Sequence, residues 1–140
     1  MARVVFELPS EFVFSTDVPI YIGHINHGHH LDNAQLLTLV AEARTRFLRS
    51  MGYTDRDAEG LAMVVGDVVV QYESEALYGE TLRIQMTPMD CNKYGFDLVF
   101  RITDAAQGRA IARGKQGLVF TDPQERGVRL LPPALLERLG

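Results

Sequence analysis

From Leu61 onward, apolar and polar residues alternate in four stretches that are separated by short turns. A period of two is typical of β-strands, because successive side chains of a strand point to opposite faces of its sheet. Strands that are joined by short turns run antiparallel, so we expect an antiparallel meander. The four expected strands run from Leu61 to Tyr72, from Leu82 to Thr87, from Phe96 to Thr103 and from Ala110 to Phe120.

The first of these strands is apolar on both faces near its middle, which predicts burial on both sides. By alternation, Met63, Val65 and Val69 lie on the face turned away from the helix described below, where a monomer would expose them to water. We therefore expect a homodimer, or a homotetramer built as a dimer of dimers. Asp67 interrupts this strand, and a buried carboxylate needs a partner. Asp67 either has a structural role near a subunit boundary or acts as a catalytic base.

One long amphipathic helix is indicated between residues 32 and 51. Asp32 is followed three residues later by Gln35, which is a capping-box pattern at the start of a helix. The expected apolar face consists of Leu36, Leu37, Val40, Ala43, Phe47, Leu48 and Met51. A single helix with one apolar face must lie on one face of the sheet. The predicted fold class is therefore α+β, with one long helix packed on a five- to six-stranded, mainly antiparallel sheet.

The remaining segments add an edge strand and a terminal helix. Residues 11–20 alternate loosely, and Pro19 places this first strand at or near a sheet edge because proline cannot donate a ladder hydrogen bond. Pro132 and Pro133 open a short terminal helix. No repeat or linker divides the 140 residues, so we expect a single domain over residues 1–140.

The composition argues against several classes of function. The net charge of −4 gives no electrostatic basis for binding nucleic acid or an anionic membrane. No apolar run is long enough to insert across a bilayer, and residues 1–10 lack the apolar core of a secretory signal. Cys91 is the only cysteine and cannot form an intrachain disulfide, which favours a reducing compartment, most simply the cytoplasm.

All four histidines lie in residues 21–33, a loop directly before the long helix that reads Tyr-Ile-Gly-His-Ile-Asn-His-Gly-His-His-Leu-Asp-Asn. A helix N-terminus carries free N–H groups and a partial positive charge, so it can bind a developing oxyanion. The histidine spacing also allows a metal site. However, no cysteine is near, and no histidine pair has the i, i+4 spacing of zinc proteases. We therefore expect neither a metal nor a cofactor.

This loop, with the helix and strands that follow it, resembles the hotdog-fold thioesterases of the 4-hydroxybenzoyl-CoA thioesterase type. Many members carry a pattern like D-x-D-x-x-G-H-V-N-N before the helix and E-A-R within it. Here His30-Leu-Asp-Asn33 and Glu42-Ala-Arg44 match these patterns. A bacterial subgroup reads roughly D-I-N-Y-G-G-H-L, which residues 24–31 match. The resemblance spans about residues 18–120, and it implies a hotdog fold, an acyl-thioester ligand and an acyl site between two subunits.

The resemblance also assigns roles to individual residues. The catalytic carboxylate of the family stands four residues before the motif histidine, where this sequence has Asn26, and the earlier acidic position of the subgroup is His24. Asparagine cannot act as a carboxylate base or nucleophile, but it can orient a water or a carbonyl by hydrogen bonds. We therefore expect Asn26 and His30 to position water and carbonyl, although fixing the turn is an equal alternative for His30. The base would be His24, His27 or Asp67.

Further residues are expected to contact the ligand. Asn33, His27 and Gly28 would line the substrate site, and the N–H of Asn33 would polarise the thioester carbonyl. By alternation, five cationic residues share the sheet face opposite the helix: Arg83, Arg101, Arg109, Arg113 and Lys115. They form either an ordinary solvated surface or, through Arg113, a contact for the phosphates of coenzyme A. Arg44 is expected to have a structural role at the rim of the helix's apolar face.

These features predict a thioesterase that acts on acyl-CoA or on acyl carrier protein thioesters. Water would attack the thioester, and the helix N-terminus would stabilise the oxyanion. Asn26 in place of a carboxylate favours an alternative, a hotdog protein that binds acyl thioesters or fatty acids without hydrolysing them. A third hypothesis is a metal-dependent hydrolase that uses the histidines.

Overall fold

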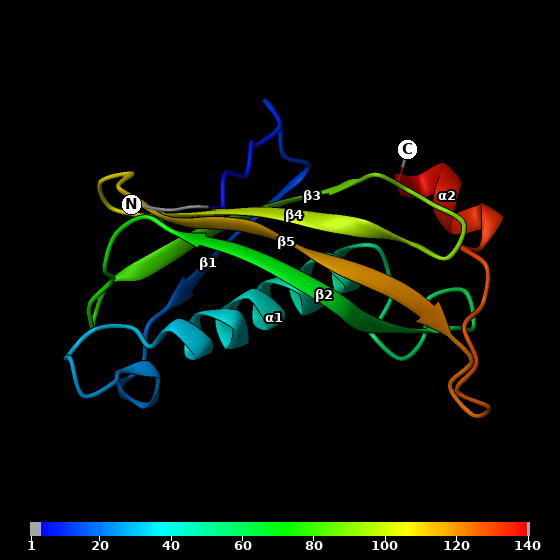
Figure 1. The fold of residues 1–140 in the computed structure, drawn as a ribbon, viewed down its shortest axis with the longest axis horizontal. Helices are drawn as coiled ribbons and strands as arrows, with labels where there is room; N and C mark the ends of the chain where they lie inside the picture. Colours follow the sequence, from blue (N-terminus) through cyan, green and yellow to red (C-terminus); the bar gives the residue numbers. More distant parts are fainter. Residues whose placement is uncertain (1–3, 140) are drawn as a thin grey trace.

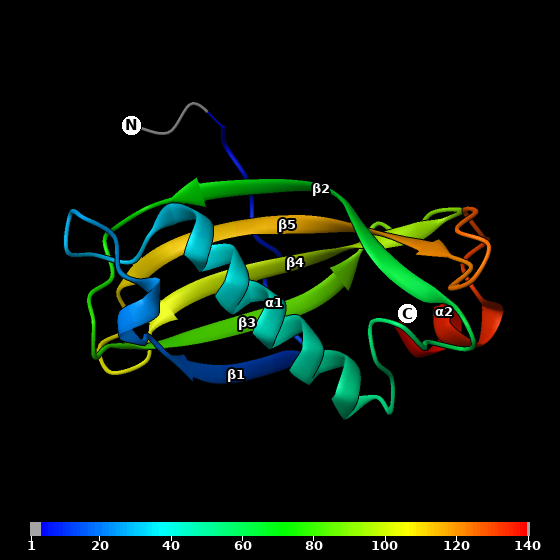
Figure 2. The ribbon, with the colours of Figure 1, turned by 90° about the horizontal axis from the view of Figure 1, so that it is seen from below.

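The computed structural model describes residues 4–139. Within these residues, a long helix, α1, packs across one face of a five-stranded sheet, and a short helix, α2, lies at the C-terminal end (Figures 1 and 2). The strands are β1 (Phe14–Pro19), β2 (Ala62–Tyr72), β3 (Thr81–Met89), β4 (Gly95–Asp104) and β5 (Ala110–Thr121). The helices are η1 (Ile22–His24, a 3-10 turn), α1 (Asn33–Ser50) and α2 (Pro133–Leu139). The predicted α+β class is confirmed, with five strands in the sheet.

The strand order is β1-β3-β4-β5-β2, and all neighbouring strands are antiparallel. β3, β4 and β5 form the expected meander, and β1 lies at an edge as Pro19 predicts. The expected position of β2 in that meander is wrong, because β2 pairs with β5 at the opposite edge. β1 already occupies the free side of β3, so residues 73–80 carry the chain across the end of the sheet. α1 thus connects one edge of the sheet to the other (Figure 2).

The core lies between α1 and the sheet. The buried residues of α1 are Leu36, Leu39, Val40, Ala43, Phe47 and Leu48. They belong to one cluster with buried side chains of β3 and β4, among them Ile84, Met86 and Phe100. Burying one such side chain contributes about 1.5–3 kcal/mol, so we expect Phe47→Ala to cost about 3–5 kcal/mol of stability. This packing fixes the N-terminal end of α1 over the sheet.

β2 contains a bulge at Gly66. Val65 pairs with Leu118, and the next paired residue, Asp67, pairs with the adjacent Gly117. The extra residue interrupts the alternation, so the side chains before and after the bulge do not share faces as strict alternation predicts. Met63 is only 8% exposed and lies in the core, so its expected position on the face away from the helix is wrong.

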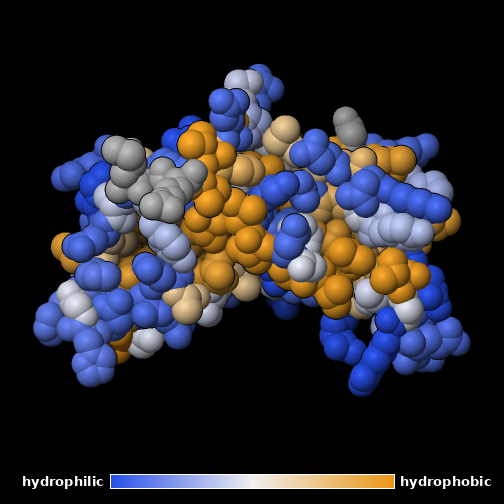
Figure 3. Space-filling model, in the orientation of Figure 1, coloured by the Kyte–Doolittle hydropathy of each residue, from blue (hydrophilic) through white to orange (hydrophobic). Residues whose placement is uncertain are grey.

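The edge formed by β2 leaves apolar side chains at the surface. Val64, Val65, Val68 and Tyr72 are 48%, 40%, 38% and 44% exposed. Figure 3 shows apolar side chains gathered across the side of the molecule on which β2 lies. The expected burial of β2 on both sides is therefore wrong for the single chain. In residues 4–139, β2 has a neighbouring strand on one side only, which sequence alternation cannot reveal.

Candidate active site

The N-terminus of α1 presents a free backbone donor. Asp32 is the cap, and its Oδ2 accepts hydrogen bonds from the N–H groups of Ala34 (3.0 Å) and Gln35 (3.2 Å). The N–H of Leu36 donates to the carbonyl oxygen of Asp32. Within residues 4–139, the N–H of Asn33 has no hydrogen-bond acceptor, and this residue is exposed. The N–H of Asn33 is therefore available to a ligand at the positive end of the helix.

The loop before α1 is held by hydrogen bonds around Asn26. The N–H of Asn26 donates to the carbonyl oxygen of His30, and its own carbonyl oxygen accepts from the N–H of His29, both at 3.0 Å. Its side-chain Oδ1 accepts the N–H of Gly28 at 2.9 Å, an Asx turn. His29 takes a left-handed conformation (φ 65°) in this turn. The side-chain oxygen of Asn26 is thus engaged, whereas its amide NH₂ remains a donor for a ligand.

His30 lies beside both Asn26 and Gly28. Its Nδ1 is 3.2 Å from the carbonyl oxygen of Leu31, so in the tautomer that carries a proton on Nδ1 the ring donates there and Nε2 is an acceptor. Nε2 faces Gly28: a methyl group added to Gly28 would lie 3.0 Å from Nε2 and 3.2 Å from Asn26 Oδ1. On its other side, Nε2 is 3.8 Å from Oε1 of Glu75. The structure therefore brings together Asn26, Gly28 and His30.

A cavity of about 300 Å³ opens beside His30 and Asn33. Its other lining residues are Leu31, Leu36, Tyr72, Glu73, Ser74, Glu75, Ala76 and Ile111. Leu31, Leu36 and Ile111 are buried and give it an apolar wall. The Tyr72 hydroxyl donates to the carbonyl oxygen of Asn33 at 2.9 Å. Burial raises the pKa of the Tyr72 phenol, and the nearby charge of Asp32 raises this pKa further, so the hydroxyl stays a donor at neutral pH.

His24 is separated from this cavity. Its Nδ1 accepts the N–H of Tyr21 at 3.0 Å and so closes the η1 turn. It lines a second groove, of about 490 Å³, beside the ion pair of Glu42 and Arg46. That groove is larger, but neither Asn26, His30 nor Asn33 lines it. We therefore place the candidate active site in the smaller cavity. His27, next to Asn26 in the loop, is exposed.

Asp67 is also distant from the cavity within one chain. It is exposed on β2 and pairs with Gly117, five residues before Tyr72, or about 16 Å along the strand. Its charge acts instead on Lys115: a hydrogen bond to Asp97 raises the pKa of Lys115, and Asp67 adds to this effect. Asp67 therefore belongs to a charged cluster on the helix-free face.

The expected cationic surface is largely neutralised. Arg113 donates to Glu73 at 2.7 Å and to the carbonyl oxygen of Phe6 at 3.3 Å. Three other members pair with carboxylates, Arg83 with Asp17, Arg109 with Glu80 and Lys115 with Asp97, whereas Arg101 donates to the neutral amide oxygen of Gln85. Arg44 has the structural role that the sequence predicts, because its side chain is 14% exposed and donates to the buried Gln116 at 2.6 Å.

Sequence reasoning missed Tyr72 and Glu75, both of which line the cavity. Tyr72 ends the strand expected from Leu61, and Glu75 follows that strand. Both lie about 40 residues from the histidine loop, and no local pattern links them to it. Within residues 4–139, no group of three or more His, Cys, Asp or Glu side chains is arranged to hold a metal ion. No helix of the same range is long and apolar enough to cross a membrane.

Comparison with known proteins agrees with this architecture. The sequence model of the thioesterase-like superfamily matches residues 20–139, which is most of the chain. The chain belongs to this superfamily. No curated protein sequence matches this thioesterase-like protein significantly. The predicted resemblance to thioesterases is thereby confirmed at the level of the family.

Solved thioesterase structures share the fold of this superfamily member. The 1,4-dihydroxy-2-naphthoyl-CoA thioesterase from Synechocystis superposes with a TM-score of 0.80 at 18% identity, covering 90% of this chain and 94% of that one. The YbaW probable thioesterase from Escherichia coli gives 0.74 at 24% identity, covering 89% and 95%. The DHNA-CoA thioesterase from Staphylococcus aureus gives 0.79 at 16% identity, covering 88% and 85%. These likenesses confirm the predicted hotdog fold.

Proposed function

We propose that this protein hydrolyses an acyl thioester in the cavity at the N-terminus of α1. The observation that carries the proposal is that Asn33, whose N–H has no hydrogen-bond acceptor within residues 4–139, lines the same cavity as His30. A donor fixed at a helix N-terminus stabilises the negative charge that develops on a thioester carbonyl oxygen. Membership of the thioesterase-like superfamily supports the same reaction.

In the proposed mechanism, the thioester carbonyl oxygen accepts the N–H of Asn33. The amide NH₂ of Asn26 and Nε2 of His30 hold a water beside the carbonyl carbon. The water oxygen forms a bond to that carbon while Nε2 of His30 takes a proton from the water. The N–H of Asn33 then stabilises the tetrahedral oxyanion by a hydrogen bond. When the C–S bond breaks, His30 returns the proton to the leaving thiolate. A single oxyanion donor of this kind contributes about 100- to 1,000-fold in rate.

The proposed carrier is coenzyme A, with acyl carrier protein as the second possibility. Two of the three solved neighbours described above are named as thioesterases of aromatic CoA thioesters, which supports this choice. The cavity of about 300 Å³ suits a short acyl chain or a single aromatic ring, since a cavity of roughly 150 Å³ already accommodates benzene. We place the protein in the cytoplasm, in keeping with its single, unpaired cysteine.

We further propose that two copies pair along β2. This strand forms a long open edge of the sheet. Its unpaired backbone groups can hydrogen-bond to another strand, and its exposed valines, Val64, Val65 and Val68, would be buried by one. Tyr72 lies at the end of the same edge and also lines the cavity, so a second copy there would stand beside the active site. A dimer of dimers would need a further contact surface.

A thiol-release assay over aliphatic and aromatic acyl-CoAs tests the proposed hydrolysis. We expect wild-type protein to release free thiol from at least one acyl-CoA, and Asn26→Ala to be slower by about 10- to 1,000-fold. Asn26→Asp keeps an oxygen for the N–H of Gly28 and restores the carboxylate of relatives, so its rate should rise.

The alternative function is binding of acyl thioesters without hydrolysis, which Asn26 in the carboxylate position favours. Calorimetric titration with the same acyl-CoAs separates the two functions. Tight binding of several acyl-CoAs without any thiol release would establish the alternative and refute the hydrolase.

A further inference from the structure

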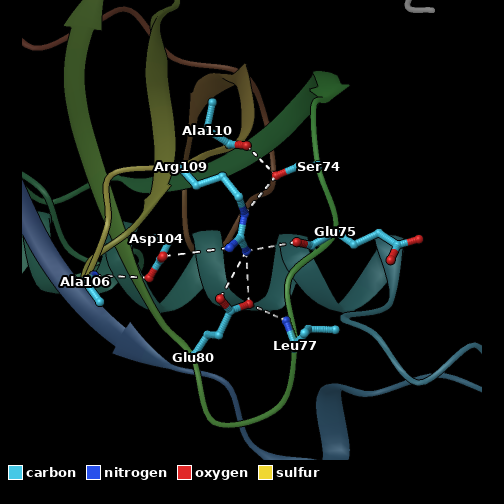
Figure 4. Close-up of polar contacts among 8 residues, drawn as sticks. All are labelled: Ser74, Glu75, Leu77, Glu80, Asp104, Ala106, Arg109 and Ala110. Carbon is cyan, nitrogen blue, oxygen red and sulfur yellow. Dashed lines mark hydrogen bonds and ion pairs between the residues drawn. The ribbon is translucent and has the colours of Figure 1, made fainter.

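The segment that joins β2 to β3 is held by one guanidinium group (Figure 4). Nη2 of Arg109 donates to the carbonyl oxygen of Glu75 (3.0 Å) and to both carboxylate oxygens of Glu80 (3.0 and 3.1 Å). Nε of Arg109 donates to Oγ of Ser74 at 3.4 Å. Asp104, which is 4% exposed, lies 3.8 Å from Nη1. An exposed connection is thus tied to the start of β5.

The same segment is tied to the histidine loop. The N–H of Leu31 donates to the carbonyl oxygen of Ala76 at 2.8 Å, and Ala76 is buried. Glu75 is therefore held through its own carbonyl oxygen by Arg109, and the next residue, Ala76, is held by Leu31. Figure 4 shows its backbone carbonyl directed at Arg109 and its side chain extending away from that cluster. The carboxylate places Oε1 3.8 Å from Nε2 of His30.

Among residues 4–139, Glu75 is the carboxylate near the cavity whose charge is not already engaged. Asp32 accepts two backbone N–H groups as the cap of α1. Glu73 is paired with Arg113 at 2.7 Å. Within residues 4–139, Glu75 forms no ion pair with a lysine or arginine, and its carboxylate lies beside His30.

We propose that Glu75 is the positioning carboxylate of His30 and supplies the negative charge that relatives carry at the position of Asn26. The proposal rests on the proposed hydrolysis. When His30 takes the proton of the attacking water, the imidazolium gains a positive charge next to Glu75. The proton then passes to the thiolate sulfur as the C–S bond breaks, so Glu75 neither gains nor loses a proton. At 3.8 Å the pair acts through charge, because a hydrogen bond would be shorter.

A double-mutant cycle tests this role. Glu75→Gln keeps the shape of the side chain and removes its charge. Because the Glu75 side chain is 72% exposed, solvent weakens the attraction, and we expect kcat to fall by about 3- to 10-fold with KM unchanged. In a His30→Gln background, the same substitution should have no effect on the residual rate. Glu137→Gln on α2, at the opposite end of the molecule, is the matched control and should leave kcat unchanged.

Thermal unfolding of each variant accompanies the kinetics. Equal losses from Glu75→Gln in the wild-type and His30→Gln backgrounds would refute the proposal, as would an unchanged kcat or a change confined to KM. In each of those cases the wild-type protein still hydrolyses thioesters, so the proposed function stands. A wild-type protein that releases no thiol would instead refute the proposed function, and the role of Glu75 with it.

Discussion

Gly28→Ala is a sharp test of the cavity, because it changes one methyl group beside the reacting atoms. The added carbon would lie 3.0 Å from His30 Nε2, 3.3 Å from its Cδ2 and 3.2 Å from Asn26 Oδ1. Carbon contacts this short are rare, so the imidazole must move by a few tenths of an ångström. Gly28 is not among the residues with positive φ, so alanine is compatible with its backbone.

The expected loss follows from the tolerance of catalytic geometry. A misplacement of about 1 Å costs roughly 100-fold in rate, so a shift of a few tenths should lower kcat by about 3- to 30-fold. The free energy of unfolding should change by less than about 1 kcal/mol, because the site is exposed and alanine restricts the unfolded chain.

Gly23→Ala is the matched control for this substitution. Gly23 also precedes α1, its φ is not positive, and an added methyl group would meet nothing within 4 Å. Thiol release and thermal unfolding would be measured for both variants. Full activity of Gly28→Ala, or an equal loss in Gly23→Ala, would show that the catalytic geometry does not lie around His30.

Three further predictions concern assembly, alkaline stability and metal. Val68→Asp places a charge on the open edge of β2, so sedimentation should show a monomer where wild type is dimeric; a monomeric wild type at micromolar concentration would refute the pairing. Burial raises the pKa of Tyr53 above 10.0, and its hydrogen bond to Glu59 adds to this, so its contribution to stability is complete below about pH 10 and is lost as pH rises through the folded-state pKa. Tyr53→Phe should reduce the loss of stability between pH 9 and pH 11 in urea unfolding, and an unchanged pH dependence would contradict this. Dialysis against a chelator should leave thiol release unchanged, whereas a loss restored by one added metal would support the metal-dependent hydrolase.

Local sequence signals predicted the elements well. Asp32 caps α1 because a side-chain oxygen needs only its own chain neighbours two and three residues ahead. Pro19 indicated an edge strand because it lacks a donor, whatever its neighbours are. These features depend on contacts within a few residues, which the sequence contains.

Non-local pairing was harder to predict. β2 does not pair with β3, its neighbour in the chain, because β1 occupies that side of β3 although it is far away in sequence. One additional residue at Gly66 means that the two halves of β2 do not follow a single alternation, so a face inferred from the residues after the bulge is wrong for Met63 before it. Glu75 approaches His30 in a segment that Arg109 and Leu31 anchor, and no spacing in the sequence encodes that contact.

The most direct test of the account compares kcat/KM of wild type and His30→Gln on the acyl-CoA that wild type hydrolyses fastest. Thermal unfolding must first show that the variant is folded, since His30 is part of the turn before the cap of α1. The account predicts a loss of at least about 100-fold, the contribution of a positioned general base. A folded His30→Gln variant that keeps the wild-type kcat/KM would contradict it and would move the chemistry away from the N-terminus of α1.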